Sequence, residues 1–112
     1  MDLNIKIEKR QRTELGKLIV QLIKAKKMTQ CKFYEKLGIS KPFFYDILAG
    51  AEAPNIEMQY RMLDILEPKE KEREKFFDLC AIQRNDIPAD IYNYIKENSS
   101  KHSKLRKMIY EF

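Results

Sequence analysis

A chain of 112 residues has the length of a single domain, and a hydrophobic content of 44% is enough to fill a core. Charged residues reach 35%, but both signs occur and the net charge is only +5, which permits nucleic-acid binding without requiring it. Charges interrupt every apolar run before membrane-spanning length, and the first residues lack the apolar stretch of a secretion signal. We therefore expect a cytoplasmic protein with no membrane partner.

Helical periodicity predicts the first element, from about Thr13 to Lys26. Its apolar residues recur every three or four positions along one face: Leu15, Leu18, Ile19, Leu22 and Ile23.

Two short helices are predicted next, separated by a tight turn. Thr29 can cap a helix over 30–37, which Gly38 can end in a left-handed conformation. Ser40 can cap the following helix, with Pro42 in its first turn, and Gly50 ends it.

Three further helices and a last amphipathic stripe complete an all-α fold without strand alternation. Asn55 can cap a helix that runs to about Leu66, and Glu67-Pro68 is expected to start the next, whose buried part contains Phe76, Phe77, Leu79 and Cys80. Ile87, Ile91 and Ile95 repeat every four residues and suggest another helix. The last stripe consists of Leu105, Met108, Ile109 and Phe112.

Residues 15–66 place these elements at a spacing typical of a known family. The stretch LGKLIVQLIKAKKMTQ, the turn LGIS, and ILAG followed by APN resemble the lambda-repressor-like DNA-binding domain of XRE, or Cro/C1-type, transcriptional regulators. EREKFFDLCAIQRNDIPADI is similar to the tail of a bacterial subgroup. The resemblance implies a helix-turn-helix domain of four to five helices over 13–66. Residues 1–12, which it does not cover, form a basic N-terminal segment. Residues 67–112 are expected to form C-terminal helices that pack on the domain or join two subunits.

The resemblance also implies which residues contact double-stranded DNA. Residues at the start of the recognition helix reach base edges, and the start of the preceding helix lies on the backbone. Lys41 can donate to guanine, Asp46 can accept from a cytosine amine, and Pro42 and Tyr45 can pack on a thymine methyl. The implied DNA-binding residues are Lys26, Lys27, Thr29, Gln30, Lys32, Ser40, Lys41, Pro42, Phe43, Tyr45 and Asp46.

Several positions depart from the family pattern. Ala49 and Glu52 stand where polar or basic residues often grip a phosphate, and Glu52 would repel one. The family often pairs an Arg and a Glu at the positions of Ile23 and Leu48, so we expect an apolar contact there instead.

The aromatic run and the N-terminal bases leave alternatives open. Phe44 is expected in the core, Phe43 can cover a neighbouring helix or a sugar, and Tyr45 is expected to be exposed to DNA or a protein. Four N-terminal bases can form an arm along DNA or a solvated tail: Lys6, Lys9, Arg10 and Arg12.

We thus expect a sequence-specific transcriptional regulator, a repressor acting as a homodimer. The alternative is a module that binds a protein, such as an antitoxin-like partner, through Phe43, Tyr45 and Asp46. No enzyme, cofactor or metal is expected, because His102 is the only histidine, in a polar surface stretch, and Cys31 and Cys80 match no ligand spacing. The stripes after residue 86 either join two subunits or pad the core of one.

Overall fold

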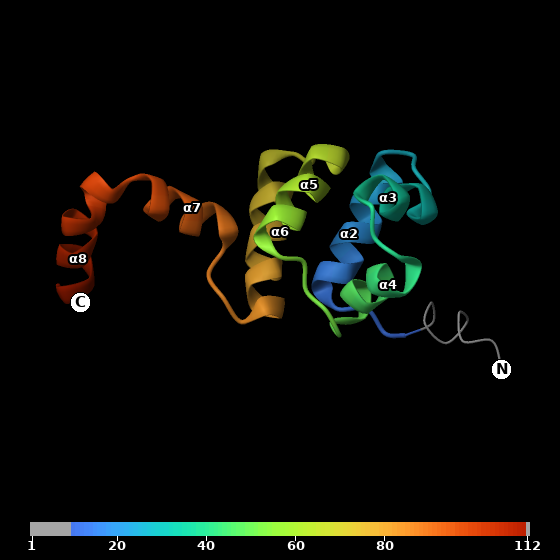
Figure 1. The fold of residues 1–112 in the computed structure, drawn as a ribbon, viewed down its shortest axis with the longest axis horizontal. Helices are drawn as coiled ribbons and strands as arrows, with labels where there is room; N and C mark the ends of the chain where they lie inside the picture. The colour runs from blue at the N-terminus through green and yellow to red at the C-terminus, as the bar shows by residue number, and fades with distance from the viewer. Residues whose placement is uncertain (1–9, 112) are drawn as a thin grey trace.

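The computed structural model describes residues 10–111, and every regular element in that part of the chain is helical, which confirms the all-α class. The helices are α2 Glu14–Ala25, α3 Gln30–Leu37, α4 Lys41–Ala49, α5 Ile56–Leu66, α6 Glu70–Arg84, α7 Ala89–Glu97, the 3-10 turn η1 Ser99–Lys101 and α8 His102–Tyr110. Helices α2 to α6 form a bundle, and α7 and α8 extend away from it (Figure 1), so the molecule measures 57 × 25 × 22 Å. No helix within this range is long and apolar enough to cross a membrane.

Helix α2 lies at the centre of the bundle, because α3, α4 and α6 all pack against it. The whole predicted stripe of α2 is buried, and Val20, which lies beside that stripe, is buried too. A helix that is covered from several sides needs a wider apolar face than the single stripe of a surface helix. Ile23 and Leu48, the two positions where the sequence predicts an apolar contact, are both fully buried in this core.

The predicted caps of the bundle helices are confirmed. Thr29, Ser40 and Asn55 each accept a hydrogen bond from the N–H three residues later, at 3.0, 3.2 and 2.8 Å. Gly38 and Gly50 end α3 and α4 with φ of +79° and +85°, in the left-handed region that glycine adopts without a steric penalty. Local chemistry therefore fixes both ends of α3 and of α4.

The boundary between α5 and α6 differs from the prediction. Glu67 ends α5 with a φ of +45°, and α6 begins only at Glu70, so Glu67-Pro68 is a connection and not a helix start. Helix α6 buries Phe76, Phe77 and Cys80 against the rest of the core, as predicted, whereas Leu79 is half-buried.

Burial raises the pKa of the Cys80 thiol from 9.0 to about 12. Because the folded state then keeps a proton that the unfolded chain releases, the free energy of unfolding should fall as pH rises from about 9 towards 12. Urea unfolding across this pH range measures the slope. Cys80→Ala is less stable at every pH but should show a shallower slope, and an equal slope in both proteins would contradict the assignment.

Lys27, between α2 and α3, has a φ of +55°, which is unfavourable for a residue with a side chain. We expect Lys27→Gly to raise the free energy of unfolding by about 0.5 to 1 kcal/mol, since glycine removes this strain but gains freedom in the unfolded chain. Lys27→Ala keeps the strain and is the control. Urea unfolding that ranks the glycine variant below the alanine variant would rule out strain at this position.

Helices α7 and α8 contribute little to the core, since Ala89 is the only one of their residues that is buried in it. Helix α7 is anchored by buried Ala89 and by Asn93, whose amide donates to the Tyr60 hydroxyl at 3.1 Å. His102, expected at the surface, begins α8 and is half-buried, with its Nε2 2.6 Å from the Ile95 carbonyl oxygen. Four residues of the predicted stripes are at least about half exposed, which excludes packing on their own core: Ile87, Ile91, Met108 and Ile109. Phe112 lies outside the described residues.

Candidate nucleic-acid interface

The candidate surface is formed by the start of α3 and by α4, which a tight turn at Gly38–Ser40 joins. The turn is supported from α5, where the Arg61 guanidinium donates to the carbonyl oxygen of Leu37, the last residue of α3. Arg61 therefore satisfies a carbonyl that a helix end leaves without an intrahelical partner. This bond engages the Arg61 guanidinium within the protein, although Arg61 as a whole is exposed.

The exposed side of α4 begins with the residues predicted to contact DNA. Ser40 is the N-cap, Pro42 is exposed in the first turn, and Lys41 is half-buried. Phe43 is half-buried and packs against the core, in agreement with the alternative in which it covers a neighbouring helix. Residues one turn apart share a helix face, so Lys41 and Pro42 lie on the same side of α4 as positions 45 and 46.

Tyr45 is buried, with 8% of its surface exposed, so the prediction that it is exposed is wrong. Its hydroxyl donates to the Gln30 Oε1 at 2.7 Å, and its ring meets that of Phe44 edge to face at a centroid distance of 5.1 Å. A buried Tyr hydroxyl normally finds a partner, and here the partner is the first residue of α3. Tyr45 thus joins the middle of α4 to the start of α3. Because the Gln30 side-chain oxygen accepts from Tyr45, Gln30 has only its side-chain N–H groups to offer to a ligand.

Asp46 forms an ion pair with Arg10, whose guanidinium Nη2 lies 2.7 Å from the Asp46 Oδ1. Both side chains are about one-third exposed, at 36% and 37%. The pair brings the end of the N-terminal segment onto α4, so Arg10 is neither a solvated tail residue nor an extended arm. It also balances the one carboxylate on the face of α4 that would otherwise repel a phosphate. Lys6 and Lys9 lie outside the described residues.

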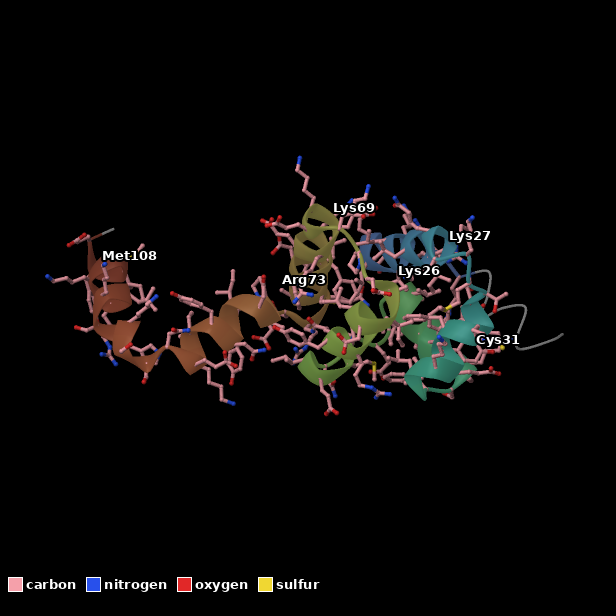
Figure 2. The ribbon with its side chains drawn as sticks, turned by 90° about the horizontal axis from the view of Figure 1, so that it is seen from above. Lys26, Lys27, Cys31, Lys69, Arg73 and Met108 are labelled. Carbon is pink, nitrogen blue, oxygen red and sulfur yellow. The ribbon has the colours of Figure 1, made fainter. Side chains whose placement is uncertain are left out.

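The predicted backbone-contacting lysines do not form one group. Lys26 donates to the Glu67 carboxylate at 2.9 Å, at the end of α5, and this ion pair lowers the pKa of Glu67. Lys27 lies beside it in the same connection (Figure 2), and Lys32 is exposed on the first turn of α3. Lys32 and Thr29 therefore lie at the candidate surface, whereas Lys26 is engaged with α5.

The loop after α4 carries the acidic residue that departs from the family pattern. Ala51 and Glu52 donate their N–H groups to the Asp46 carbonyl oxygen at 2.9 and 3.2 Å, which closes the end of α4. The Glu52 side chain is exposed. The loop is thus ordered by its backbone, and the carboxylate remains at the surface.

A close helix contact fixes the position of α4. We call Thr13, Gly16, Leu48, Gly50 and Gln83 the α2–α4 junction. A Cβ atom on Gly16 would lie 2.2 Å from the Leu48 carbonyl oxygen, and one on Gly50 would lie 2.6 Å from the Thr13 Cγ2. The Thr13 N–H donates to the same Leu48 oxygen at 3.0 Å. The start of α2 and the end of α4 therefore touch backbone to backbone.

Gln83, from α6, completes this junction. Its Nε2 donates to the carbonyl oxygens of Ile47 and Glu52 at 2.9 and 2.7 Å, and its Oε1 accepts from the Thr13 hydroxyl at 2.8 Å. The Thr13 oxygen in turn accepts from the Gly16 N–H at 3.1 Å as the cap of α2. Sequence reasoning missed Gln83 because a polar residue near the end of a charged helix carries no signal of a long-range partner.

Within residues 10–111, no three His, Cys, Asp or Glu side chains gather where they could hold a metal ion. Comparison of the chain with family models, with curated proteins and with solved structures gave no match.

Proposed function

We propose that the chain is a sequence-specific, double-stranded DNA-binding transcriptional regulator of the XRE, or Cro/C1, type, with a lambda-repressor-like helix-turn-helix domain. In this proposal α4 is the recognition helix, α3 lies across the backbone, and the protein acts as a repressor in the form of a homodimer. The observation that carries the proposal is the bond between Tyr45 and Gln30, which sets α4 against the start of α3.

Two features of α3 support a phosphate contact. The N–H groups of the first helical turn lack intrahelical partners, and a helix N-terminus attracts anions. Gln30 stands at this position with its carbonyl oxygen engaged by Tyr45, so its amide N–H groups are the ones available to a phosphate oxygen. Lys32, exposed in the same first turn, adds positive charge to this end of the helix.

Base reading in this proposal rests on the first turn of α4. Lys41 can donate to a guanine, and exposed Pro42 can pack on a thymine methyl. Tyr45 holds Gln30 and is not a base reader, and Asp46 is balanced by Arg10. Few readers per subunit mean modest discrimination by one copy, which favours binding as a dimer to two half-sites.

The test is fluorescence anisotropy on the DNA just upstream of the chain's own gene, with a shuffled duplex as control, at low and physiological salt. We expect a preference for the upstream DNA that survives physiological salt. Lys41→Ala should lose about 1–3 kcal/mol of discrimination. Lys32→Ala should weaken binding to both duplexes and reduce the salt slope by about one. Lys75→Ala, an exposed residue of α6, is the matched control.

Tyr45→Phe tests the positioning step separately. It removes one hydroxyl and keeps the packed ring, so affinity should fall while the helical circular dichroism spectrum stays unchanged. Equal, weak and salt-erased binding of the wild type to both duplexes would sink the proposal. It would favour the second candidate, a protein-binding module, for which the exposed Glu52 beside α4 is the supporting observation.

A further inference from the structure

Exposed apolar side chains are concentrated in the C-terminal part of the chain. Within residues 10–111, all of the strongly exposed large hydrophobic residues lie beyond residue 81: Ile82, Ile87, Ile91, Tyr92, Tyr94, Met108, Ile109 and Tyr110. Figure 2 shows Met108 at the opposite end of the molecule from Lys27 and Cys31. Contiguous exposed apolar surface with a polar rim marks an interaction site. Helix α8, which carries Met108, therefore lies far from the candidate DNA surface.

An acidic groove runs along α6 beside the start of α7. It consists of two adjoining hollows that share Asp78, and we call it the α6–α7 groove. Exposed apolar side chains, Ile82 and Ile91, lie within it. Its one base, Arg73, has its guanidinium 5.3 Å from the Phe77 ring centroid. The carboxylates that line the groove are Glu70, Glu74, Asp78, Asp86 and Asp90.

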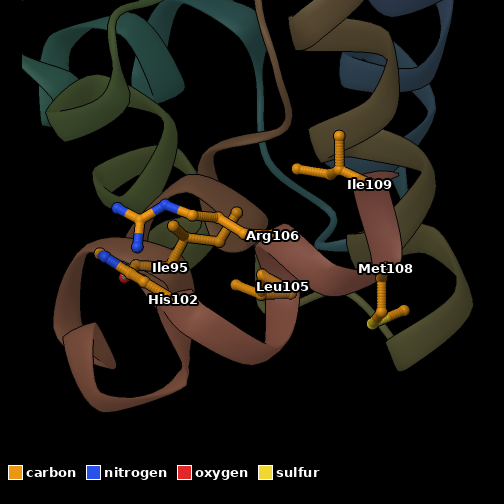
Figure 3. A pocket seen from close by; sticks show the side chains of 6 residues that line it. All are labelled: Ile95, His102, Leu105, Arg106, Met108 and Ile109. Atoms are coloured by element: carbon orange, nitrogen blue, oxygen red, sulfur yellow. Dashed lines mark hydrogen bonds between the residues drawn. The ribbon is translucent and has the colours of Figure 1, made fainter. Parts of the chain in front are cut away.

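Helix α8 has the opposite character. Its apolar residues Leu105, Met108 and Ile109 line an open hollow of about 390 Å³ together with Ile95 (Figure 3). The bases beside them are Lys101, Lys104, Arg106 and Lys107, and Glu111 is the one acid between Asn98 and the end of the described chain. Helix α8 is thus basic and amphipathic, which complements the apolar floor and acidic rim of the groove.

Some of the charges on each side have no ion-pair partner within the described chain. No ion pair within residues 10–111 engages the carboxylates of Glu70, Glu74 or Asp78, and none engages Lys104 or Lys107. Charged patches of opposite sign that have no partner within one copy can pair between copies and fix their register.

The same chain cannot bring its own α8 into its own groove in this arrangement. Helix α7 has nine residues and is about 13 Å long, with the groove at its start and α8 at its end. The contact of His102 with the Ile95 carbonyl and the hydrogen bond of the Lys101 Nζ with the Tyr94 hydroxyl, at 2.7 Å, hold α8 at that far end. A second copy in the reverse orientation has its α8 free to enter.

We propose that two copies of the chain form a two-fold dimer in which α8 of each copy lies in the α6–α7 groove of the other. Two-fold symmetry repeats the same contact in each copy, so one short helix from each copy covers the exposed apolar side chains in the groove of the other. Met108 and Ile109 of one copy then cover Ile82 and Ile91 of its partner. The proposed function supplies only the reason to expect a dimer. The present proposal names the surface through which the two copies bind.

The experiment measures molecular mass in solution by sedimentation velocity, without DNA, on the full chain. One variant, Lys104→Glu with Lys107→Glu, gives α8 a negative charge. The other, Glu70→Lys with Glu74→Lys and Asp78→Lys, gives the groove a positive charge, because four bases then stand beside the two remaining acids, Asp86 and Asp90. The wild type should be a dimer, and each variant alone should raise the dimer Kd by at least roughly tenfold, because like charges then face each other.

Mixing the two variants supplies the decisive outcome. In the mixed dimer the acidic α8 meets the basic groove, and the unchanged α8 meets the unchanged groove, so the dimer should re-form at close to the wild-type Kd. Lys71→Glu with Lys75→Glu changes the same charge on an exposed part of α6 that does not line the groove, and it should leave the dimer intact.

Three results would overturn the proposal. A monomeric wild type would show that the apolar region serves another partner. A dimer unaffected by either variant would place the contact elsewhere. Variants that stay monomeric when mixed would refute the exchange of α8. None of these results bears on DNA preference, which the anisotropy measurement decides by itself.

Discussion

Gly16→Ala is expected to lower the free energy of unfolding by about 2 to 3 kcal/mol, because the added methyl group collides with backbone atoms of α4. The Cβ would lie 2.2 Å from the Leu48 oxygen and 2.8 Å from its Cα, and backbone cannot move aside as a side-chain tip can. Overpacking of a core typically costs 1 to 3 kcal/mol. Helix propensity alone predicts the opposite sign, since Ala is better than Gly by about 1 kcal/mol.

Urea unfolding followed by circular dichroism measures this effect. Lys17→Ala, at the adjacent exposed position of α2, is the control and should stay within about 0.5 kcal/mol of the wild type. A Gly16→Ala variant that is as stable as the wild type would show that α2 and α4 are farther apart. If the contact is as described, the variant should also bind DNA more weakly below its unfolding transition, because α4 must tilt to admit the methyl group.

Gln83→Leu is the second change with a large expected effect, at about 2 to 3 kcal/mol. Leucine removes the donor to two carbonyl oxygens, of Ile47 and Glu52, and the acceptor for the Thr13 hydroxyl. Each polar group left without a partner away from water costs about 1 to 3 kcal/mol, and the partial exposure of this site lowers the total. The substitution should also loosen the loop after α4.

The matched control is Gln21→Leu, which makes the same change at an exposed position of α2. Thermal unfolding of the two variants should differ clearly, with Gln83→Leu melting well below Gln21→Leu. Gln83→Glu adds a sharper comparison: it keeps an acceptor for Thr13 but brings a carboxylate to two carbonyl oxygens, so it should be no more stable than Gln83→Leu. Similar melting of all three variants would mean that the junction does not depend on Gln83.

The helices of the bundle could be predicted from the sequence because the residues that start and end them act over only a few positions. The caps at Thr29, Ser40 and Asn55 act within three residues, and Gly38 and Gly50 act at a single φ angle. The start of α6 was mispredicted because Glu67 adopts a left-handed conformation that its residue type does not favour.

The interior of the candidate site was less predictable. Tyr45 was placed on the exposed side from helical geometry, but its burial depends on Gln30, fifteen positions earlier in the sequence. Arg10 and Asp46, Lys26 and Glu67, and Thr13 and Gln83 are likewise pairs from distant segments. Such contacts follow from how helices pack, and no spacing rule within one helix reveals them.

The packing of α2 against α6 also sets an order of events during synthesis. Helices α3 and α4, which follow α2 directly in the sequence, cover one side of it. The other side is covered only when α6 has been synthesised. At about 5 to 20 residues per second, roughly 3 to 12 s pass between the synthesis of residue 25 and that of residue 84. During this interval an apolar face of α2 stays uncovered on the ribosome, so the nascent chain is open to chaperones until α6 emerges.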